Sequence, residues 1–598
     1  IGNDANGESR VAYIRGFFDA DSIQVPDGSG GTRTEPLRNR SSRLGDVVHS
    51  TPLFVGKPAS TWPNRGYFGS EGKRYTNFVS GNASSREPML YVGANDGMLH
   101  GFNATLSGDD AGQEAFAYVP GAVYSSEAKA GLHYLTDPNY EHRYYVDLTP
   151  VAQDVFIVTD PDDFGNSSTD SDRDEKRNWT TVLVGGMRTG GRGIFALDVT
   201  DPNDYTNSAI EAEDTVLWEF TNAHSDDMGY LDEGVSIAML NDQKWAVIFG
   251  NGYNSENGEA GVFILYVEEG IDGTWTVNDD YRFLGTDVGS SGDKNGLSTV
   301  SVADLDGDRV ADRIYGGDLK GNMWAFDISS DNPSTWGSAY MDGSAPEALF
   351  VATDADGDVQ PITAAPGLAA NSEQSVAGNA PNVFVTFGTG QYLVSGDQLD
   401  DSLQSYYTIW DNGDSAGGAI EREDLAARAL SQTGDVLKMA GDAIDWTQQQ
   451  GWYFDFAVNS SEEGERLVNK PLLRSDKEVG PVAIFASMIP GESACEGGGS
   501  SALYAIPLAD GLNPTKAIMD LDGDGNGVEA IDDEGNSDDM GVGTTRSNLL
   551  NDPNCLGNTC YSSLGDYTKL GGTETLDQTA IDIDNGSERL GRLGWYEM

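Results

Sequence analysis

The sequence has 598 residues, of which 38% are hydrophobic and 75 are glycine, and its net charge at pH 7 is −60. This charge argues against nucleic-acid binding, because phosphate recognition needs a basic surface, and against docking on anionic lipid. No stretch approaches the roughly 18–20 apolar residues that span a bilayer, so we expect no membrane insertion. Aromatic residues make up 10% of the chain, which together with the glycines favours strands and tight turns.

The first 43 residues are polar and include a Gly/Ser-rich insert, QVPDGSGGTRTEP. The chain begins Ile-Gly-Asn-Asp, with neither an initiator methionine nor a signal peptide. We therefore expect a processed or truncated product of a longer protein, in which residues 1–43 follow a missing N-terminal region.

One pattern recurs six times between residues 44 and 510: a strand, a variable loop, a second strand, a glycine-rich turn and an aromatic strand. The clearest hairpin is Met89–Ala104, whose two apolar strands flank the turn Asn95-Asp96-Gly97. Related hairpins are expected over 181–199, 244–267, 313–328, 382–393 and 482–508. A further strand is expected before each hairpin, over 50–55, 149–158, 235–240, 298–305, 361–369 and 470–474.

Such units, repeated without helical crossovers, are typical of a β-propeller. We predict an all-β fold in which residues 44–510 form a propeller of about seven modified blades with loop insertions. The seventh blade is expected from the chain ends, residues 1–43 and the irregular, acidic tail 511–598, which finishes in the strand-like GRLGWYEM. Ile420–Leu430 has acidic residues early and arginine late, which predicts a short amphipathic helix.

One loop concentrates aspartates at its positions 1, 3, 5 and 9. Without a counter-ion they would repel and raise one another's pKa, whereas Ca²⁺ accepts six to eight oxygen ligands in a forgiving geometry. The expected ligands are four carboxylates and one backbone carbonyl: Asp304, Asp306, Asp308, Asp312 and Val310. A helical EF-hand would need an acid at position 12, but this loop runs into a strand. The pattern predicts a calcium site between two strands, the alternative being a solvated acidic turn.

The tail contains a second loop of similar spacing. Its expected ligands are Asp520, Asp522, Asp524, Asn526 and Glu529. Neither Glu529 nor Asp532 closes it in standard register, so a second calcium site and a solvated turn are equal alternatives. A third acidic segment, Asp354–Asp358, leads straight into a strand without a closing acid, and we expect a plain hairpin turn there.

No catalytic motif is recognisable in the sequence. The five histidines lack metal-ligand spacing, and there is no GxSxG elbow, Walker loop or CxxC. We expect His49 and His142 to pack or to form hydrogen bonds. Cys555 and Cys560 could close a small ring, which would leave Cys495 free or paired with a missing region. Five tryptophans are expected to pack within blades: Trp218, Trp245, Trp324, Trp410 and Trp452.

Taken in order, several phrases resemble the C-terminal propeller of the type IV pilus tip-associated adhesins, the calcium-binding pilus-biogenesis factors. They are LGDVVHSTPLFVG, YVGANDGMLHGFNA, AFAYVPGAV, HRYYVDLTP, VGGMRTGGRGIFALDV, FGNGYNS, DLDGDRVADRIYGGDLKGNMWAFDI, QPITAAP and FGTGQYL. The resemblance covers roughly residues 44–508, and the family's calcium loop maps onto Asp304–Asp312. It implies a non-enzymatic, calcium-dependent tip adhesin that regulates pilus assembly and retraction. It also implies secretion through the periplasm to the cell surface and minor pilins as partners, bound through the tail or residues 1–43.

Two alternatives remain open at the level of sequence. A quinoprotein-type oxidoreductase would use Ca²⁺ to hold a quinone, and its site usually brings a stacking tryptophan and, in many members, a vicinal disulfide. This chain has no adjacent cysteine pair, and its expected calcium ligands lie in a single loop between strands. A generic calcium-stabilised cell-surface propeller shares the loop but not the other phrases. The adhesion ligand does not follow from the sequence, because a propeller's specificity lies in its loops.

Overall fold

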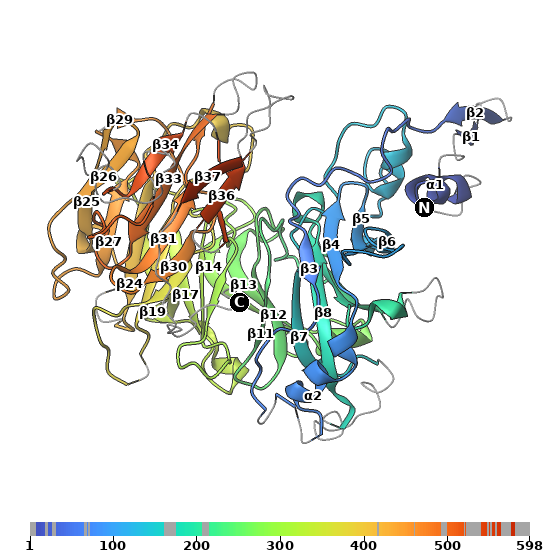
Figure 1. The fold of residues 1–598 in the computed structure, drawn as a ribbon, viewed down its shortest axis with the longest axis horizontal. Coiled ribbons are helices and arrows are strands. Elements are labelled where there is room, and N and C mark those ends of the chain that lie inside the picture. Colours follow the sequence, from blue (N-terminus) through green and yellow to red (C-terminus); the bar gives the residue numbers. More distant parts are fainter. Residues whose placement is uncertain are drawn as a thin grey trace. The chain divides into compact units, whose positions relative to one another are not determined.

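The structure is a computed structural model, and strands dominate it (Figure 1). It describes residues 7–17, 22–26, 32–64, 68–69, 72–160, 175–205, 215–378, 380–414, 418–459, 461–491, 499–519, 521, 540–546, 549–550, 553–556, 559–563 and 576–580. The chain forms two compact units, and the division between them falls within strand β14 (Tyr281–Gly289). Unit 1 comprises Ile1–Phe283 and Gly289–Gly296, and unit 2 comprises Leu284–Val288 and Leu297–Met598.

Helices are short in the described part of the chain. The α-helices there are α1 (Gly7–Ile14) and α2 (Tyr75–Ser80). Single turns of 3-10 helix are η1 (Asn82–Ser85), η2 (Gly121–Val123), η3 (Leu132–Thr136), η4 (Arg188–Gly190), η5 (Pro202–Asp204), η6 (Glu269–Asp272), η7 (Pro333–Thr335), η8 (Asp397–Leu399) and η9 (Arg422–Asp424). None of the helices in the described ranges is long and apolar enough to cross a membrane.

Unit 1 consists of antiparallel sheets whose strands follow one another in chain order, as in propeller blades. The first sheet contains β3 (Leu53–Val55), β4 (Met89–Ala94), β5 (Met98–Asn103) and β6 (Glu114–Tyr118). The second contains β7 (Val151–Ile157), β8 (Asn178–Gly186), β9 (Gly193–Asp198) and β10 (Val216–Thr221). The third joins β11 (Ser236–Met239), β12 (Trp245–Gly250), β13 (Glu259–Tyr266) and β14. A separate ribbon pairs β1 (Ser22–Pro26) with β2 (Thr32–Pro36).

Unit 2 begins with a sheet that carries the aspartate-rich loop. Its strands are β15 (Ser301–Ala303), β16 (Arg313–Gly317), β17 (Asn322–Asp327), β18 (Gly337–Ser338) and β21 (Phe350–Val351). Three smaller sheets are β19 (Tyr340–Asp342) with β20 (Ala345–Glu347), β28 (Ala457–Val458) with β29 (Ser461–Glu462), and β35 (Asn554–Leu556) with β36 (Thr559–Ser563) and β37 (Leu576–Ala580). The β35–β36 register sets Cys555 opposite Cys560 in the backbone.

The rest of unit 2 is a continuous 11-stranded sheet, in which two four-stranded blades are joined by a hairpin. The first blade has β22 (Gly367–Ala370), β23 (Val383–Gly388), β24 (Ser405–Asp411) and β27 (Gly451–Asp455). The second has β30 (Leu472–Asp476), β31 (Gly480–Ala486), β33 (Gly499–Pro507) and β34 (Gly543–Arg546), with β32 (Ile489–Pro490) paired to β33. The joining hairpin is β25 (Ala426–Thr433) with β26 (Val436–Ala440).

The structure confirms the all-β prediction: the first four expected repeats each lie in a sheet of their own, and the last two form blades of the 11-stranded sheet. The five tryptophans expected to pack within blades are buried. The prediction of a helix over Ile420–Leu430 is wrong. Only η9 is helical there, and it is followed by strand β25, in which alternate residues are buried. The strand expected at GRLGWYEM lies outside the described residues, so the seventh blade stays a prediction.

Candidate metal site

The aspartate-rich loop joins two paired strands. In the β15–β16 register Ala303 lies opposite Arg313, which brings Asp304 at the loop's start close to Asp312 at its end. The N–H of Asp312 donates a 2.8 Å hydrogen bond to the carbonyl of Ala303. The strand pairing therefore fixes both ends of the loop.

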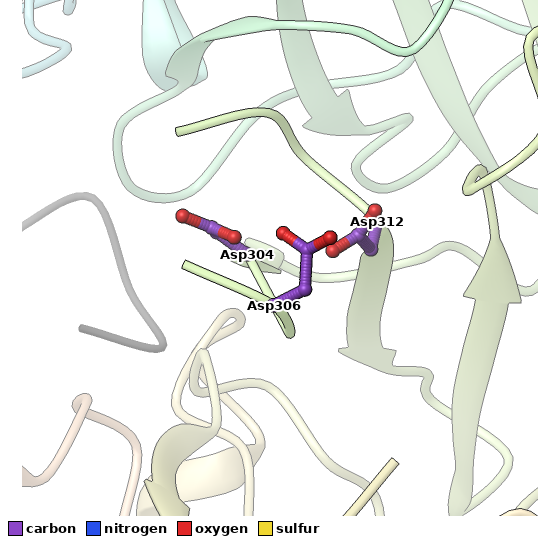
Figure 2. Close-up of side chains that lie close together, drawn as sticks. All are labelled: Asp304, Asp306 and Asp312. Carbon is purple, nitrogen blue, oxygen red and sulfur yellow. The ribbon is translucent and has the colours of Figure 1, made fainter. Parts of the chain in front are cut away.

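Three of the predicted ligands gather in this loop (Figure 2): Asp304, Asp306 and Asp312. Each offers a carboxylate oxygen, and these oxygens lie within 4.8 Å of one another. Two oxygens bound to one Ca²⁺ at their usual distances lie at most about 5 Å apart, so the spacing fits a shared ion. Across the described residues, no other group of three or more acidic, histidine or cysteine side chains comes together in this way.

Asp304 organises the backbone of the loop. One of its oxygens accepts hydrogen bonds from the N–H groups of Gly307 (2.7 Å) and Asp308 (3.2 Å), and the other accepts from Arg309 (2.9 Å). Burial raises the pKa of Asp304, and the negative charges of Asp308 and Asp306 add to the effect, although these N–H donors oppose it. The site thus holds a carboxylate whose environment favours an additional positive charge.

The remaining predicted ligands are placed differently. Asp308 is not part of the three-carboxylate group, and its Oδ1 accepts a 2.8 Å hydrogen bond from the N–H of Val310. Asp312 also anchors the loop, since its Oδ2 accepts from the N–H of Leu305 at 2.8 Å. The ligand roles of Asp308 and of the Val310 carbonyl stay predictions.

The two other acidic loops differ in what the structure describes of them. All five ligands expected in the tail, Asp520 to Glu529, lie outside the described residues. Asp354–Asp358 is the plain turn that was expected: Thr353 and Val359 form an antiparallel bridge, and the N–H of Asp358 donates to Asp354 Oδ1 at 2.9 Å. The spacing of acids alone therefore does not gather carboxylates, because the closing Asp312 has no counterpart in this turn.

A buried ionic network, missed by reasoning from the sequence, adjoins the site. Arg313 directly follows Asp312, and its Nε lies 3.2 Å from Oδ2 of Asp411, which has no exposed surface. The same carboxylate accepts hydrogen bonds from the hydroxyls of Tyr315 (2.7 Å) and Tyr340. The available signal was the alternation of Arg313 and Tyr315 on β16, which directs both side chains to one face of the sheet.

His49 and His142 form hydrogen bonds, as expected. His49 Nδ1 lies 2.5 Å from Asp147 Oδ2, and His142 Nε2 lies 2.8 Å from Asp46 Oδ2.

A third histidine, His100, contacts two carboxylates, Asp96 through Nε2 at 3.1 Å and Glu114 through Nδ1 at 2.6 Å. Burial alone would lower the pKa of His100, but the hydrogen bonds and charges of Asp96 and Glu114 outweigh burial and raise it.

Comparison with known proteins agrees with this architecture. The family model described as the PilY1 beta-propeller domain matches residues 44–444. A type IV pilus biogenesis factor PilY1 homolog of Xylella fastidiosa is 35% identical over 86% of this chain and 32% of its own length. The type IV pilus biogenesis factor PilY1 of Pseudomonas aeruginosa strain PAK is 32% identical over 87% of this chain and 42% of its own length. The chain thus spans less than half of either relative.

A solved structure extends the match to three dimensions. The crystal structure of the Pseudomonas aeruginosa PilY1 C-terminal domain superimposes with a TM-score of 0.63 and 28% sequence identity. The match covers 88% of this chain and 99% of that domain. With its repeated four-stranded sheets and this coverage, the chain belongs to the PilY1 β-propeller family.

Proposed function

We propose that this chain is the calcium-dependent propeller of a non-enzymatic type IV pilus tip adhesin that regulates pilus assembly and retraction. Family membership supports the pilus role, since the relatives are named type IV pilus biogenesis factors. The calcium role is supported by one observation, the carboxylates of Asp304, Asp306 and Asp312 within 4.8 Å of one another.

The three aspartates of the loop have different roles in the proposed calcium site. Asp304 holds the turn in place through the backbone N–H groups it accepts, and Asp312 holds the loop's end against Leu305 and β15. Asp306 is the solvent-exposed carboxylate of the three. Bound Ca²⁺ supplies the positive charge that offsets the repulsion among these groups.

The affinity decides whether the site regulates or only stabilises. A dissociation constant of roughly 10⁻⁴ to 10⁻³ M, typical of extracellular modules, would let occupancy follow ambient calcium, whereas a much tighter site stays filled. We propose the regulatory regime, in which occupancy biases pilus extension against retraction.

The partners and location follow from the same proposal. The protein acts at the cell surface, at the pilus tip, after secretion through the periplasm. Minor pilins bind it through the tail 511–598 or residues 1–43, which leaves the loops of the propeller for the adhesion ligand. Co-purification with minor pilins that survives deletion of both segments would contradict this assignment of the contact.

The test compares two acidic loops of the same chain. Asp306→Asn with Asp312→Asn removes two charges from the candidate site while preserving side-chain shape. Asp354→Asn with Asp356→Asn removes two charges from the turn at Asp354–Asp358, where no carboxylate group forms, and serves as the matched control. Calorimetric titration with Ca²⁺ should show binding by the parent and the control and none at this site in the first variant.

Piliation, surface attachment and twitching are then measured in cells that carry each variant. We expect the first variant to lose attachment or motility and the control to retain both. Calcium binding unchanged from the parent would overturn the site. Lost binding with normal pili and attachment would leave a calcium site that is only structural.

A further inference from the structure

The segment after β23 presents apolar side chains to solvent. Within eight residues four of them are exposed, namely Tyr392 (47%), Leu393 (37%), Val394 (66%) and Leu399 (73%). This segment, Gln391–Asp400, includes the last residues of the phrase FGTGQYL and the turn η8. We call it the apolar crest. Clustered exposure of large apolar side chains marks interaction sites more often than single exposed residues do.

A buried carboxylate holds the crest in one conformation. Asp397 accepts hydrogen bonds from the N–H groups of Leu393 (2.6 Å) and Val394 (2.9 Å) and from the side-chain amide of Gln391 (2.9 Å). The N–H of Asp397 in turn donates to the carbonyl of Val394 at 3.0 Å. The N–H groups of Leu393, Val394 and Asp397 are therefore hydrogen-bonded within the crest. A partner would contact the side chains of the crest and could not pair with it as an added strand.

A buried arginine fixes the crest from below. Arg466 is 1% exposed, and its guanidinium donates to the carbonyls of Gln391 (3.1 Å), Asp397 (2.9 Å), Asp400 and Gly464 (3.0 Å). Burying a cation is costly unless its donors are satisfied, and here backbone carbonyls of the crest satisfy most of them.

The glycine before the crest makes this contact possible. Gly390 has a positive φ of 126°, and a Cβ there would lie 2.5 Å from Cβ of Arg466. The glycine in FGTG is thus required so that the chain can pass directly over the arginine.

We propose that the apolar crest is a preformed docking surface for a protein partner whose own contact surface is an apolar depression bordered by lysine or arginine. The internal hydrogen bonds hold the crest in the conformation that binds, so docking orders few additional groups and loses little entropy. Exposed apolar side chains on such a rigid loop are suited to act as anchors in a pocket of the partner.

The acidic residues around the apolar crest are the reason for expecting a partner with a basic border. Asp400, Asp401 and Glu463 are exposed beside it, and Gly464, the neighbour of Glu463, packs against the backbone of Asp400. In a chain with a net charge of −60 this acidic border repels anionic lipid and a second copy of the chain. A partner with a basic border is attracted and correctly oriented by the same charges.

The experiment places a photo-crosslinking amino acid, p-benzoylphenylalanine, at Tyr392 of the full-length protein in its own bacterium. The same amino acid at Val359 is the control, because Val359 is also an exposed apolar side chain of unit 2 but lies in the plain turn after Asp354. We expect a product from position 392 and none from 359, with the attachment in an apolar stretch of the partner bordered by basic residues. Asp400→Lys with Asp401→Lys should abolish the product, whereas Asp354→Lys with Asp356→Lys should not.

The identified partner is then purified and titrated against the purified chain. Val394→Ser with Leu399→Ser changes two exposed side chains, so thermal unfolding should match the parent while the dissociation constant rises at least about tenfold. Attachment to lipid, to a second copy or to another part of the same chain would overturn the proposal. So would the absence of a product, a product that survives the charge reversal, or unchanged affinity of the double variant.

Discussion

Arg313 and Asp411 face each other in the interior of unit 2, with Nε of the guanidinium 3.2 Å from the carboxylate. Arg313 is also the residue after Asp312 and the first residue of β16, so a carboxylate of the candidate metal site and a buried ion pair are neighbours in the chain. Asp411 lies on β24, in another sheet of the same unit. The side chain of Arg313 therefore links the end of the loop at Asp304–Asp312 to the interior of unit 2.

We predict that Asp411→Asn lowers the free energy of unfolding of unit 2 by about 3 kcal/mol, because it leaves Arg313 buried without a counter-charge. Arg313→Met should also destabilise the protein, but the double variant should cost less than the sum, since neither buried charge is then left alone. Denaturant titrations of the parent and the three variants measure this coupling. Additive losses would show that the pair does not interact.

We predict that Ca²⁺ raises the thermal-unfolding midpoint of the parent by several degrees. At a concentration 100-fold above the dissociation constant, binding to the folded state alone adds about 2.7 kcal/mol. The shift should disappear in Asp306→Asn with Asp312→Asn and persist in Asp354→Asn with Asp356→Asn. Differential scanning calorimetry with Ca²⁺ or with a chelator makes the comparison, and Mg²⁺ at equal ionic strength controls for screening. An equal shift in both variants would mean that calcium acts elsewhere.

We predict that His100 makes the stability of unit 1 depend on pH. Its pKa is raised in the folded protein, so its contribution is complete below the ordinary histidine value of about 6.5 and is lost as the pH rises through the raised value. His100→Gln should cost about 2 kcal/mol at pH 6, the size of hydrogen bonds to a charged group, and less at pH 9.

Unfolding midpoints between pH 6 and 9 test the role of His100. His142→Gln is the control, because its partner Asp46 and His142 itself are about half exposed, and such pairs contribute little. A constant difference between His100→Gln and the parent across this range would contradict the prediction.

Ionisation of the buried Glu465 should destabilise the folded protein, whereas ionisation of a carboxylate in an ion pair stabilises it. Burial raises its pKa, and the hydroxyls of Ser487 and Tyr504 donate hydrogen bonds to it, which oppose the rise. The folded protein therefore loses stability as the pH rises from the ordinary glutamate value of about 4.3 through the raised one. Glu465→Gln keeps an acceptor for both hydroxyls but cannot ionise. It should match the parent near pH 4.5 and exceed its stability at pH 8, as followed by chemical denaturation. Parallel pH profiles would rule out ionisation of Glu465 as the cause.

The hairpins were predictable because their signals are local. Asn95-Asp96-Gly97 requires a tight turn, Gly97 has the positive φ of 92° that such turns use, and the flanking residues are apolar on both sides. Asp304, Asp306 and Asp312 could be grouped for a similar reason, since nine residues between paired strands leave little room for separation. The Asp308 side chain was less predictable, because its hydrogen bond to Val310 depends on a rotamer that spacing does not determine.

The wrongly predicted helix over Ile420–Leu430 shows which information a short stretch of sequence does not contain. Glu421 and Asp424 form a capping box, but the helical turn that follows it, η9, is only three residues long. The next residues, Ala-Ala-Arg-Ala-Leu, fit a helix or a strand equally well by propensity. They become β25 because β27, more than 20 residues later in the chain, offers a strand edge that pairs with Ala426–Arg428 in parallel. A distant pairing of this kind leaves no trace in the local pattern, and neither does the choice of Asp411 as the partner of Arg313.

The hairpin β25–β26 connects the last two described blades so that they should resist a pulling force together. β25 pairs with β27 and β26 pairs with β34, so backbone hydrogen bonds run without interruption from β22 to β30. A pulling force applied to either blade is carried into the other by rows of hydrogen bonds as well as by side-chain packing. These blades should therefore yield to tension together, as one element of high resistance, rather than detach one at a time.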